Sequence, residues 1–559
     1  MTWLVPLPVI LPLLGAGLTL MLGRRPALQR TVSTLVLSAV VAIAATLLYQ
    51  ADQHGPQVLW IGAWKEPLGI SLVADRLSAL MLLVSAVVTL AVLVYSIGQG
   101  MIRDERDTPL TIYHPTFLVL AAGVSNAFLA GDLFNLFVSF EMLLFASYVL
   151  LTLGGTAARI RAGTIYVVVN VVSSALFLIS LAAVYAATGS LNLAQLAGRI
   201  SDLPDSVSLL LQLLLLTTFS IKAAVFPLSF WLPDSYPTAP APVTAVFAGL
   251  LTKVGIYAII RTQTLLFPAS PLTDLLLVAA VLTLVMGILG AVAQTDIKRM
   301  LSFTLVSHIG YMVFGISLGT VAGYSGAIFY VVHHITIQTT LFLVLGLVER
   351  RGGSTSLIRL GGLARLAPLL GVLFFVPAMN LAGIPPMSGF LGKVALTDAG
   401  LEVGTPLAYA TVAAGMATSL LTLYAVAKCW NLAFWRTPEE AHQRARELAE
   451  VGQGSPDVVR HGDYIHLGPG TFGAADQDEA RSIVDEEDGS NQDMHQLGRA
   501  GLLQTRLPRT MVGATLGLVA ASLALTVLAG PLFAYTGRAA HDLADRDLYI
   551  SAVLPGGSR

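Results

Sequence analysis

Long apolar runs separated by short polar or charged segments fill most of the 559-residue chain. A helix of about 20 apolar residues crosses the ~30 Å hydrocarbon core of a membrane, so each run predicts one transmembrane helix. The pattern predicts an all-α polytopic membrane protein with about 14 spans, at 3–22, 32–50, 77–98, 113–130, 133–153, 163–188, 207–229, 239–262, 271–293, 299–319, 322–348, 367–396, 405–431 and 509–536.

Two polar segments are longer than a simple connection. Residues 51–76 mix turn-forming residues with Trp60, Trp64 and Ile70, which predicts a short external β-hairpin. Residues 436–506 begin with the charged helical run PEEAHQRARELAE and pass into Gly- and Asp-rich sequence around DEEDGSNQD. Such sequence buries too little apolar surface to order itself, so we expect much of this insertion to be flexible.

The composition agrees with a chain made of an apolar membrane part and one charged insertion. Hydrophobic residues make up 55% of the chain and charged residues 12%, against roughly 25% charged in soluble domains. The insertion alone holds 14 acids and 7 bases, so the net charge of −1 averages a basic membrane part and an acidic segment. The sequence contains no basic patch with interleaved aromatic residues, so we do not expect it to bind nucleic acid. The single cysteine, Cys429, excludes a disulfide framework and a cysteine-built metal site.

Lysine and arginine are distributed unequally between the short loops, and this bias predicts the orientation. One set of loops carries Arg24, Arg25, Arg30, Arg103, Arg106, Arg159, Arg161, Lys298, Arg299, Arg350, Arg351, Arg359 and Arg365. The other set carries only Lys65, Arg76, Arg199 and Arg261. The basic side is predicted to be cytoplasmic, with both termini outside and the insertion inside. The first apolar run lacks a preceding basic region, so we expect a membrane span and not a cleaved signal peptide.

Ionisable side chains within the spans are the candidates for function, because each costs ~2.5–3.5 kcal/mol to insert. We predict a proton-translocating set of Glu141, Lys222, Lys253, His308, His333, His334 and Lys393. Structural alternatives remain open for each residue type. The glutamate could be a protonated packing carboxyl, the histidines could be satisfied core residues, and the lysines could reach the interface. The last alternative suits Lys253 and Lys393 least, because both lie deep in their spans.

Prolines interrupt two of the spans near these lysines. Pro227 follows Lys222 by five residues, and Pro385 and Pro386 precede Lys393. Proline breaks the helical hydrogen-bond ladder, and broken helices in membranes occur where the backbone is buried in protein or lines a hydrated cavity. We therefore expect helix breaks at these three prolines.

The interrupted spans divide the chain into units. Residues 113–262 and 263–435 form two five-span units, and an odd number makes the second enter the membrane from the opposite side, as in inverted-repeat transporters. Residues 1–112 precede them with three helices and the hairpin. The charged insertion at 436–508 and the last helix with an external tail at 509–559 follow them.

Three runs in this region carry a family resemblance: GDLFNLFVSFEMLLFASYVLLTLGG, IKAAVFPLSFWLPDSYPTAPAPVTAVFAGLLTKVGIYAIIR and AGIPPMSGFLGK. Over roughly residues 60–435 the chain resembles the antiporter-like membrane subunits of respiratory complex I and Mrp cation/proton antiporters. It is most similar to the D subunits of Mrp-type Na+/H+ antiporters.

This resemblance implies a fourteen-helix fold with inverted repeats at helices 4–8 and 9–13. It also implies a paired switch of Glu141 and Lys222, continued by Lys253, the histidines and Lys393. One position departs from the pattern. Related subunits often carry a lysine where this chain has Gln338, so the central relay is expected to depend on His333 and His334.

The preferred interpretation is a subunit of a multi-subunit Na+(K+)/H+ antiporter in a bacterial plasma membrane, driven by the proton gradient. Its expected partners are the other membrane subunits and the lipid bilayer, with H+ and Na+ or K+ as substrates. One alternative is a proton-pumping subunit of complex I or a membrane-bound hydrogenase; such subunits often end in a long lateral helix, for which residues 537–559 are too short. Another is a structural subunit with a vestigial channel, which the intact Glu141, Lys222, Lys253 and Lys393 argue against. No cofactor-binding motif is present, so we expect a transporter subunit without redox chemistry of its own.

Overall fold

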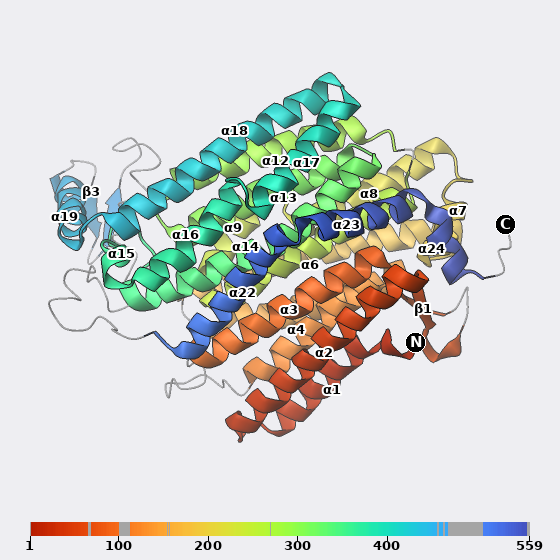
Figure 1. Ribbon diagram of the computed structural model, residues 1–559, viewed down its shortest axis with the longest axis horizontal. Coiled ribbons are helices and arrows are strands. Elements are labelled where there is room, and N and C mark those ends of the chain that lie inside the picture. Colours follow the sequence, from red (N-terminus) through yellow and green to blue (C-terminus); the bar gives the residue numbers. More distant parts are fainter. Residues whose placement is uncertain are drawn as a thin grey trace.

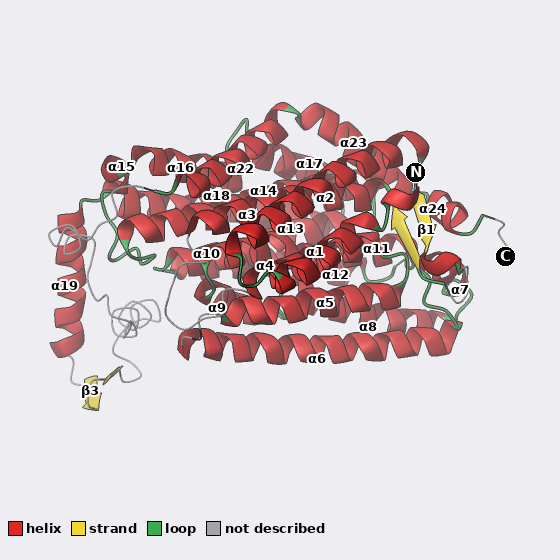
Figure 2. Cartoon of the chain, turned by 90° about the horizontal axis from the view of Figure 1, so that it is seen from below, coloured by secondary structure: helices red, strands yellow, loops and turns green. Residues whose placement is uncertain are grey.

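The computed structural model describes residues 2–64, 69–99, 112–153, 155, 157–268, 270–454, 458–461, 464–467 and 507–555. Helices run side by side along one common direction, as two perpendicular views show (Figures 1 and 2). Both chain ends lie at one end of this bundle, and helix α19 (Pro438–Gly454) lies at the opposite end (Figure 1).

The described first half of the chain contains helices and one pair of strands. The N-terminal part holds η1 (Thr2–Leu4), α1 (Leu7–Met21), α2 (Pro26–His54), β1 (Gln57–Trp60), η2 (Ile61–Ala63), β2 (Ser71–Ala74) and α3 (Arg76–Gln99). Next come α4 (Tyr113–Leu129), α5 (Leu133–Thr152), α6 (Ala157–Thr188), α7 (Leu193–Arg199), α8 (Asp205–Ala223), α9 (Trp231–Ser235), η4 (Tyr236–Thr238), α10 (Ala241–Val246), η5 (Phe247–Leu251) and α11 (Thr252–Leu265).

The second half holds α12 (Thr273–Ala293), α13 (Ile297–Ser317), α14 (Val321–Gly352), α15 (Leu363–Leu366), α16 (Pro368–Ala382), α17 (Ser388–Val403), α18 (Pro406–Cys429) and η6 (Trp430–Trp435). After α19 come β3 (Val458–His461), β4 (Tyr464–Leu467), α22 (Arg509–Val527), α23 (Ala529–Ala544) and α24 (Arg546–Val553).

Among the described residues, 12 helices are long and apolar enough to cross a membrane. Each coincides with one of the predicted spans, which confirms an all-α polytopic membrane protein. The other two predicted spans correspond to shorter helices. The run at 113–130 forms α4 of 17 residues, and the run at 367–396 is divided into α16 and α17. Proline and glycine between Ala382 and Ser388 separate these two helices.

Two segments are buried along their whole apolar length: α14, of 32 residues, and residues 241–265, from α10 to α11. α14 packs against α13, α16, α17, α22 and α23, so protein surrounds it. Its hydrophobic residues lie on all sides, as expected of a helix buried inside a bundle. The polar residues of α14 therefore face other helices.

Residues 51–76, where a hairpin is predicted, contain the antiparallel pair β1–β2, with Gln57 opposite Ala74 and Trp60 opposite Ser71. The amide of Gly131 donates to the Ser71 carbonyl at 3.0 Å, which attaches β2 to the turn between α4 and α5. A Cβ at Gly131 would lie 2.4 Å from the Ser71 hydroxyl, so this approach requires glycine. Of the insertion at 436–506, α19 and the pair β3–β4 are described. The expected flexibility of the rest falls outside the described residues.

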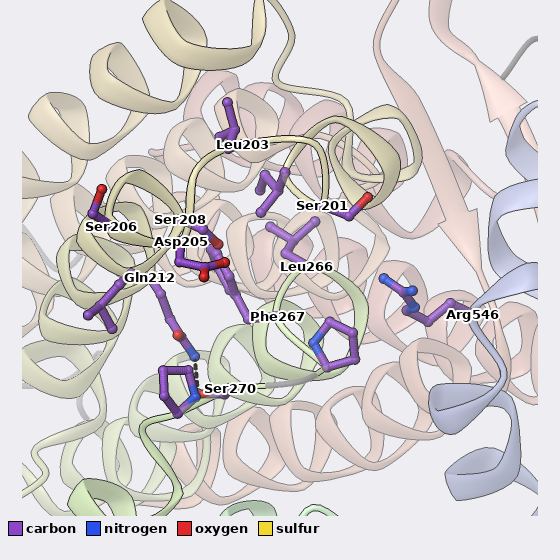
Figure 3. A pocket seen from close by; sticks show the side chains of 14 residues that line it. Ser201, Leu203, Asp205, Ser206, Ser208, Gln212, Leu266, Phe267, Ser270 and Arg546 are labelled. Atoms are coloured by element: carbon purple, nitrogen blue, oxygen red, sulfur yellow. Dashed lines mark hydrogen bonds between the residues drawn. The ribbon is translucent and has the colours of Figure 1, made fainter.

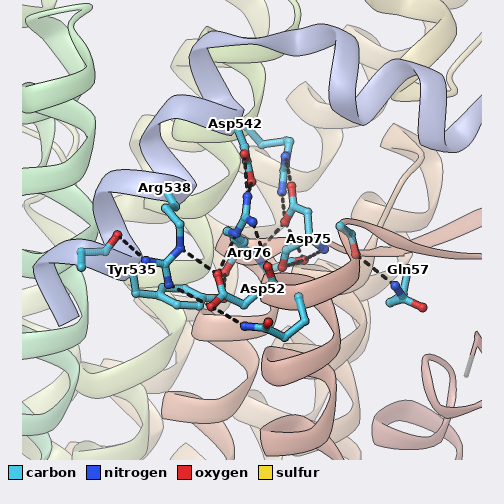
Figure 4. Close-up of polar contacts among 12 residues, drawn as sticks. Asp52, Gln57, Asp75, Arg76, Tyr535, Arg538 and Asp542 are labelled. Carbon is cyan, nitrogen blue, oxygen red and sulfur yellow. Dashed lines mark hydrogen bonds and ion pairs between the residues drawn. The ribbon is translucent and has the colours of Figure 1, made fainter. Parts of the chain in front are cut away.

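Ion pairs join the C-terminal helices to the N-terminal ones at the end of the bundle that holds both termini (Figure 4). Arg76 at the start of α3 pairs with Asp52 of α2 at 2.9 Å and with Asp542 of α23 at 2.7 Å. Arg538 of α23 also pairs with Asp52, at 2.8 Å. The hydroxyl of Tyr535 donates to the Arg76 carbonyl. These bonds hold α23 against α2 and α3, although α23 lies more than 450 residues later in the sequence.

Candidate functional site

Lys222 lies in the last turn of α8, and its side chain is buried at 4% exposure. Its Nζ donates to the Ser174 hydroxyl at 3.0 Å and to the Asn170 carbonyl at 3.4 Å, both on α6. The ammonium also lies 5.7 Å from the ring centroid of Phe140 on α5. Neutral oxygens and an aromatic face surround the ammonium, and no carboxylate of the described residues is in contact with it.

Glu141 follows Phe140 on α5 and is half-buried. Its Oε1 is buried and has no hydrogen-bond partner among the described residues. Glu141 is close enough to Lys222 to interact electrostatically, although the two form no direct ion pair. A carboxylate near a buried lysine, but not in contact with it, is an arrangement in which a small movement changes their coupling strongly, because Coulomb energy depends on distance and local dielectric.

Lys253 is fully buried at the start of α11, directly after the π-helical segment η5. Its Nζ donates to the Ala248 carbonyl at 2.6 Å, within that segment. π-helical turns shift the backbone hydrogen-bond register and are frequent at functional sites. Gly255, two residues further on, would place a Cβ 2.7 Å from the Ala223 amide nitrogen, so α11 closely approaches the end of α8 beside Lys222.

The histidines meet between α13 and α14. The rings of His308 and His334 stack with their centroids 5.2 Å apart. His308 Nδ1 lies 2.8 Å from the Tyr330 hydroxyl, and His333 Nδ1 lies 3.0 Å from the Ser388 hydroxyl at the start of α17. Neither nitrogen of His334 has a hydrogen-bond partner in the described chain. These rings offer free proton-accepting nitrogens within a buried cluster.

Gln338 lies one helical turn beyond His334 on the fully buried face of α14. Its amide nitrogen donates to the Leu301 carbonyl at 2.7 Å, whereas Oε1 has no partner within the described residues. The side chain therefore offers one acceptor to the interior. It cannot itself carry a positive charge.

Lys393 lies in α17 with 8% exposure, and its Nζ donates to the carbonyls of Leu381 and Ala382 at 3.1 and 2.9 Å. These carbonyls belong to the end of α16, where Gly383 at φ 85° terminates the helix. The Nζ also lies 5.2 Å from the ring centroid of Tyr311 on α13. The ammonium therefore binds the carbonyls that the end of α16 leaves without a helical partner, and it lies next to the histidine cluster.

Two helices, α8 and α16, end a few residues before the prolines at which breaks are expected. α8 ends at Ala223, followed by the left-handed Ala224 and then Pro227; α16 ends at Ala382, followed by the left-handed Gly383 and then Pro385 and Pro386. The two lysines differ in position, because Lys222 precedes its break and Lys393 follows the other. A cavity of about 270 Å³ adjoins the first break, lined in part by Pro227, Asp234 and Arg299.

The structure thus brings Lys253, His308, His333, His334 and Lys393 into one buried cluster, with Glu141 and Lys222 beside it. The helices that carry these residues pack together, since α13 lies against α11, α14 and α17. Sequence reasoning missed the neutral groups that join these residues: Asn170, Ser174, Tyr311, Tyr330 and Ser388. Their positions in otherwise apolar runs are a usable signal, because a buried hydroxyl or amide is costly unless it has a partner.

Another cavity, of about 650 Å³, lies apart from this cluster, between the start of α8, the end of α11 and Arg546 of α24 (Figure 3). Asp205 and several serines contribute its polar lining. Gln212 donates to Gln263 Oε1 at 2.6 Å and to the Ser270 hydroxyl at 2.5 Å. None of the predicted site residues lines this cavity, so the size of a cavity does not identify the site here.

Comparison with known proteins gives a family. Residues 130–422 match the family model described as NADH:quinone oxidoreductase/Mrp antiporter, TM. The D subunit of the Na(+)/H(+) antiporter of Alkalihalophilus pseudofirmus is 40% identical over 453 residues, which cover 80% of this chain and 90% of that protein. The protein of the same name from Bacillus subtilis is 39% identical over 451 residues, covering 79% and 90%.

Solved structures agree with the sequence relatives. A chain of the Mrp complex from Dietzia sp. DQ12-45-1b superposes with a TM-score of 0.82 at 33% identity, covering 99% of this chain and all of that one. A chain of respiratory complex I from Thermus thermophilus superposes with a TM-score of 0.72 at 22% identity, covering 97% and 99%, which shows the shared fold. With its apolar helices, this protein is a multi-pass protein of a bacterial membrane, and it belongs to the NADH:quinone oxidoreductase/Mrp antiporter family of membrane subunits.

Proposed function

We propose that this chain is a proton-translocating membrane subunit of a multi-subunit Mrp-type Na+(K+)/H+ antiporter. The observation that carries the proposal is the row of buried ionisable groups from Glu141 to Lys393, within the region matched by the family. The named relatives are Na+/H+ antiporter subunits, and a close structural neighbour is part of an Mrp complex. The chain would accordingly work as a secondary transporter subunit with other membrane subunits, and not as an enzyme.

Glu141 and Lys222 act as the switch of this row. When the carboxylate approaches, it stabilises a protonated lysine; when it withdraws, only Ser174, Asn170 and the Phe140 ring remain around Nζ. The lysine then favours release of its proton, because a buried charge without a counter-charge is costly. Lys253 lies next along the row, on the helix that packs against the end of α8.

The histidine cluster carries the proton between Lys253 and Lys393. Imidazole accepts a proton on one nitrogen and donates from the other, so stacked rings with free nitrogens can relay it through water. Gln338 adds an acceptor but no charge, so His333 and His334 carry the central step. Lys393 ends the row. The carbonyls at the end of α16 stabilise its protonated form, and it releases the proton when these contacts separate.

We infer that residues 113–262 and 263–435 are inverted repeats. In each unit a helix ends at a left-handed residue, and a proline follows three positions later: Ala224 and Pro227, then Gly383 and Pro386. Broken helices of this kind lie at the ion sites of inverted-repeat transporters.

Ion exchange can be measured in everted membrane vesicles that contain the complete complex. We expect added Na+ or K+ to dissipate a preformed ΔpH when this subunit is present, and to have no effect in vesicles from a strain that lacks it. A complex I-like subunit would instead support pH changes driven by NADH oxidation and indifferent to Na+. That second result would replace the antiporter assignment.

Both termini are proposed to lie outside the cell, with the α15 and α19 end of the bundle in the cytoplasm. In a Cys429→Ala background, Arg365→Cys, at an exposed position of α15, should resist an impermeant maleimide added to intact cells, because it belongs to the basic loops. Ser201→Cys, at the other end of the bundle, should be labelled and serves as the matched control. The reverse pattern would invert the orientation.

A further inference from the structure

A cavity of about 410 Å³ lies where α14 ends and where α16 and α22 begin. We call it the arginine pocket; its defining residues are Arg351, Leu366, Ala367, Leu369, Arg509 and Leu516. It lies at the basic end of the bundle, away from the row of proton carriers, and none of the residues discussed for ion exchange lines it. Its two guanidinium groups come from helices 158 positions apart in the sequence.

Arg351 is 7% exposed and lacks a carboxylate partner in the described chain. Its Nη2 donates to the Leu366 carbonyl at 3.3 Å, while its Nη1 is buried and has no hydrogen-bond partner in the part of the chain that the structure describes. A buried guanidinium with an unsatisfied nitrogen is costly, and a bound anion removes this cost by supplying both charge and acceptor oxygens. Arg509 lines the same cavity and makes no ion pair with a described residue.

Two helix N-termini add to the positive potential. α16 begins at Pro368 and α22 at Arg509, and their N-cap residues, Ala367 and Pro508, have no side-chain group that could bond the first turn. A helix dipole and the free amides of a first turn favour an anion such as phosphate. In α16 the first residue is a proline and the Leu370 amide donates to the Ala367 carbonyl at 2.9 Å, so α16 contributes mainly its dipole. Leu369 and Val512, in these first turns, both line the cavity.

The rest of the lining is apolar and continues onto the outside of the bundle. Leu366, Leu369 and Leu516 are 41%, 49% and 43% exposed. On a membrane-spanning bundle such leucines face acyl chains, and the arginines above them lie at the level of the lipid headgroups. A soluble phosphate would use the arginines alone, whereas a phospholipid uses both halves of the pocket.

We propose that the arginine pocket binds an anionic phospholipid, with the headgroup phosphate between Arg351 and Arg509 and an acyl chain along the leucines of α16 and α22. Basic pockets between transmembrane helices at the cytoplasmic surface recognise such headgroups. The bound lipid joins α14, α16 and α22 at one end, which stabilises the packing of the last membrane span against the second five-span unit.

The test is a lipid titration of the detergent-purified full-length chain by native mass spectrometry. Dioleoyl phosphatidylglycerol is compared with dioleoyl phosphatidylcholine, which has the same acyl chains without the net negative charge. We expect phosphatidylglycerol to bind wild type at least about tenfold more tightly, since two arginines near the surface each contribute about a fivefold preference. Arg509→Gln should weaken it about fivefold, and the double variant with Arg351→Gln more than tenfold.

Arg365→Gln is the matched control, because Arg365 is an exposed arginine of α15 at the same end and does not line the pocket. It should leave both affinities within a factor of about two. Arg509 is exposed, so its removal tests the site without disturbing the core. Equal binding of the two lipids, or an Arg509→Gln variant that binds phosphatidylglycerol like wild type, would overturn the proposal. Displacement of the lipid by equimolar inorganic phosphate would assign the pocket to a soluble anion instead.

Discussion

Glu141→Gln is expected to abolish ion exchange in a complex that still assembles. Glutamine keeps the shape of the side chain but removes the negative charge, so a protonated Lys222 is no longer stabilised and cannot reload. Exchange should fall at least about tenfold, since the loss of ~1.4 kcal/mol at the limiting step is sufficient. The measurement is Na+-dependent ΔpH dissipation in everted vesicles, with assembly of the complex followed in parallel.

Further variants separate charge from packing. Glu141→Ala should be as inactive as Glu141→Gln, whereas Glu141→Asp keeps the charge with a shorter reach and should retain partial exchange with a shifted pH optimum. Glu402→Gln is the matched control, because Glu402 is an exposed glutamate of α17 outside the row. Wild-type exchange by an assembled Glu141→Gln complex would leave Glu141 a packing residue.

Arg261→Met is expected to destabilise the protein more than any surface charge substitution. Arg261 and Asp75 are both buried and form a two-point ion pair, with N–O distances of 2.7 and 2.8 Å. The guanidinium also lies 5.0 Å from the ring centroid of Tyr549 on α24. Removing one partner of a buried pair typically costs ~3–5 kcal/mol, because the other charge stays buried alone.

The stability loss of Arg261→Met is expected to depend on pH, which distinguishes a stranded charge from lost packing. Burial alone would raise the pKa of Asp75, but the charge and hydrogen bonds of Arg261, with those of Ser78, hold it below its usual value. In wild type the carboxylate therefore contributes stability above the unfolded pKa of about 3.9, and this is lost as the pH falls through the lower folded pKa. In Arg261→Met burial dominates, so Asp75 takes up a proton more readily and the stability defect shrinks as the pH falls from 7 towards 5.

The measurement is the temperature at which half of the detergent-purified chain is lost from its gel-filtration peak, at pH 7 and pH 5. Asp75→Asn added to Arg261→Met should recover most of the loss at pH 7, because no buried charge remains. Arg538→Met is the control, since Arg538 is nearly half exposed and exposed pairs contribute little. A pH-independent defect that Asp75→Asn does not relieve would place the effect in lost packing.

The sequence predicted most of the helices, because a membrane imposes a local rule: a long apolar run must form a helix to satisfy its backbone hydrogen bonds. It was less accurate where that rule meets a helix break. The single span predicted at 509–536 ends at Val527 and resumes as α23 at Ala529, whereas the span predicted at 113–130 agrees with α4 within one residue. The identities of Glu141, Lys222 and Lys393 as candidates also followed from sequence, because charge in an apolar run is conspicuous.

Arg261 shows where local reasoning failed. Its place near the end of an apolar run suggested a loop residue, but the structure buries it against Asp75, 186 positions earlier. A local sequence pattern cannot predict a partner so far away in the sequence. The phospholipid pocket proposed at Arg351 and Arg509 depends in the same way on two helix ends that only folding brings together.

The sequence by itself therefore determined which segments enter the membrane, where prolines break them and which ionisable residues they contain, since hydropathy, backbone geometry and charge act within a few residues. Only the tertiary structure decided which of these groups meet. It stacked His308 on His334 across α13 and α14, placed Lys393 on the carbonyls of α16 and left Glu141 near Lys222 without contact. Electrostatic coupling and proton transfer depend on distances between helices, and packing sets those distances.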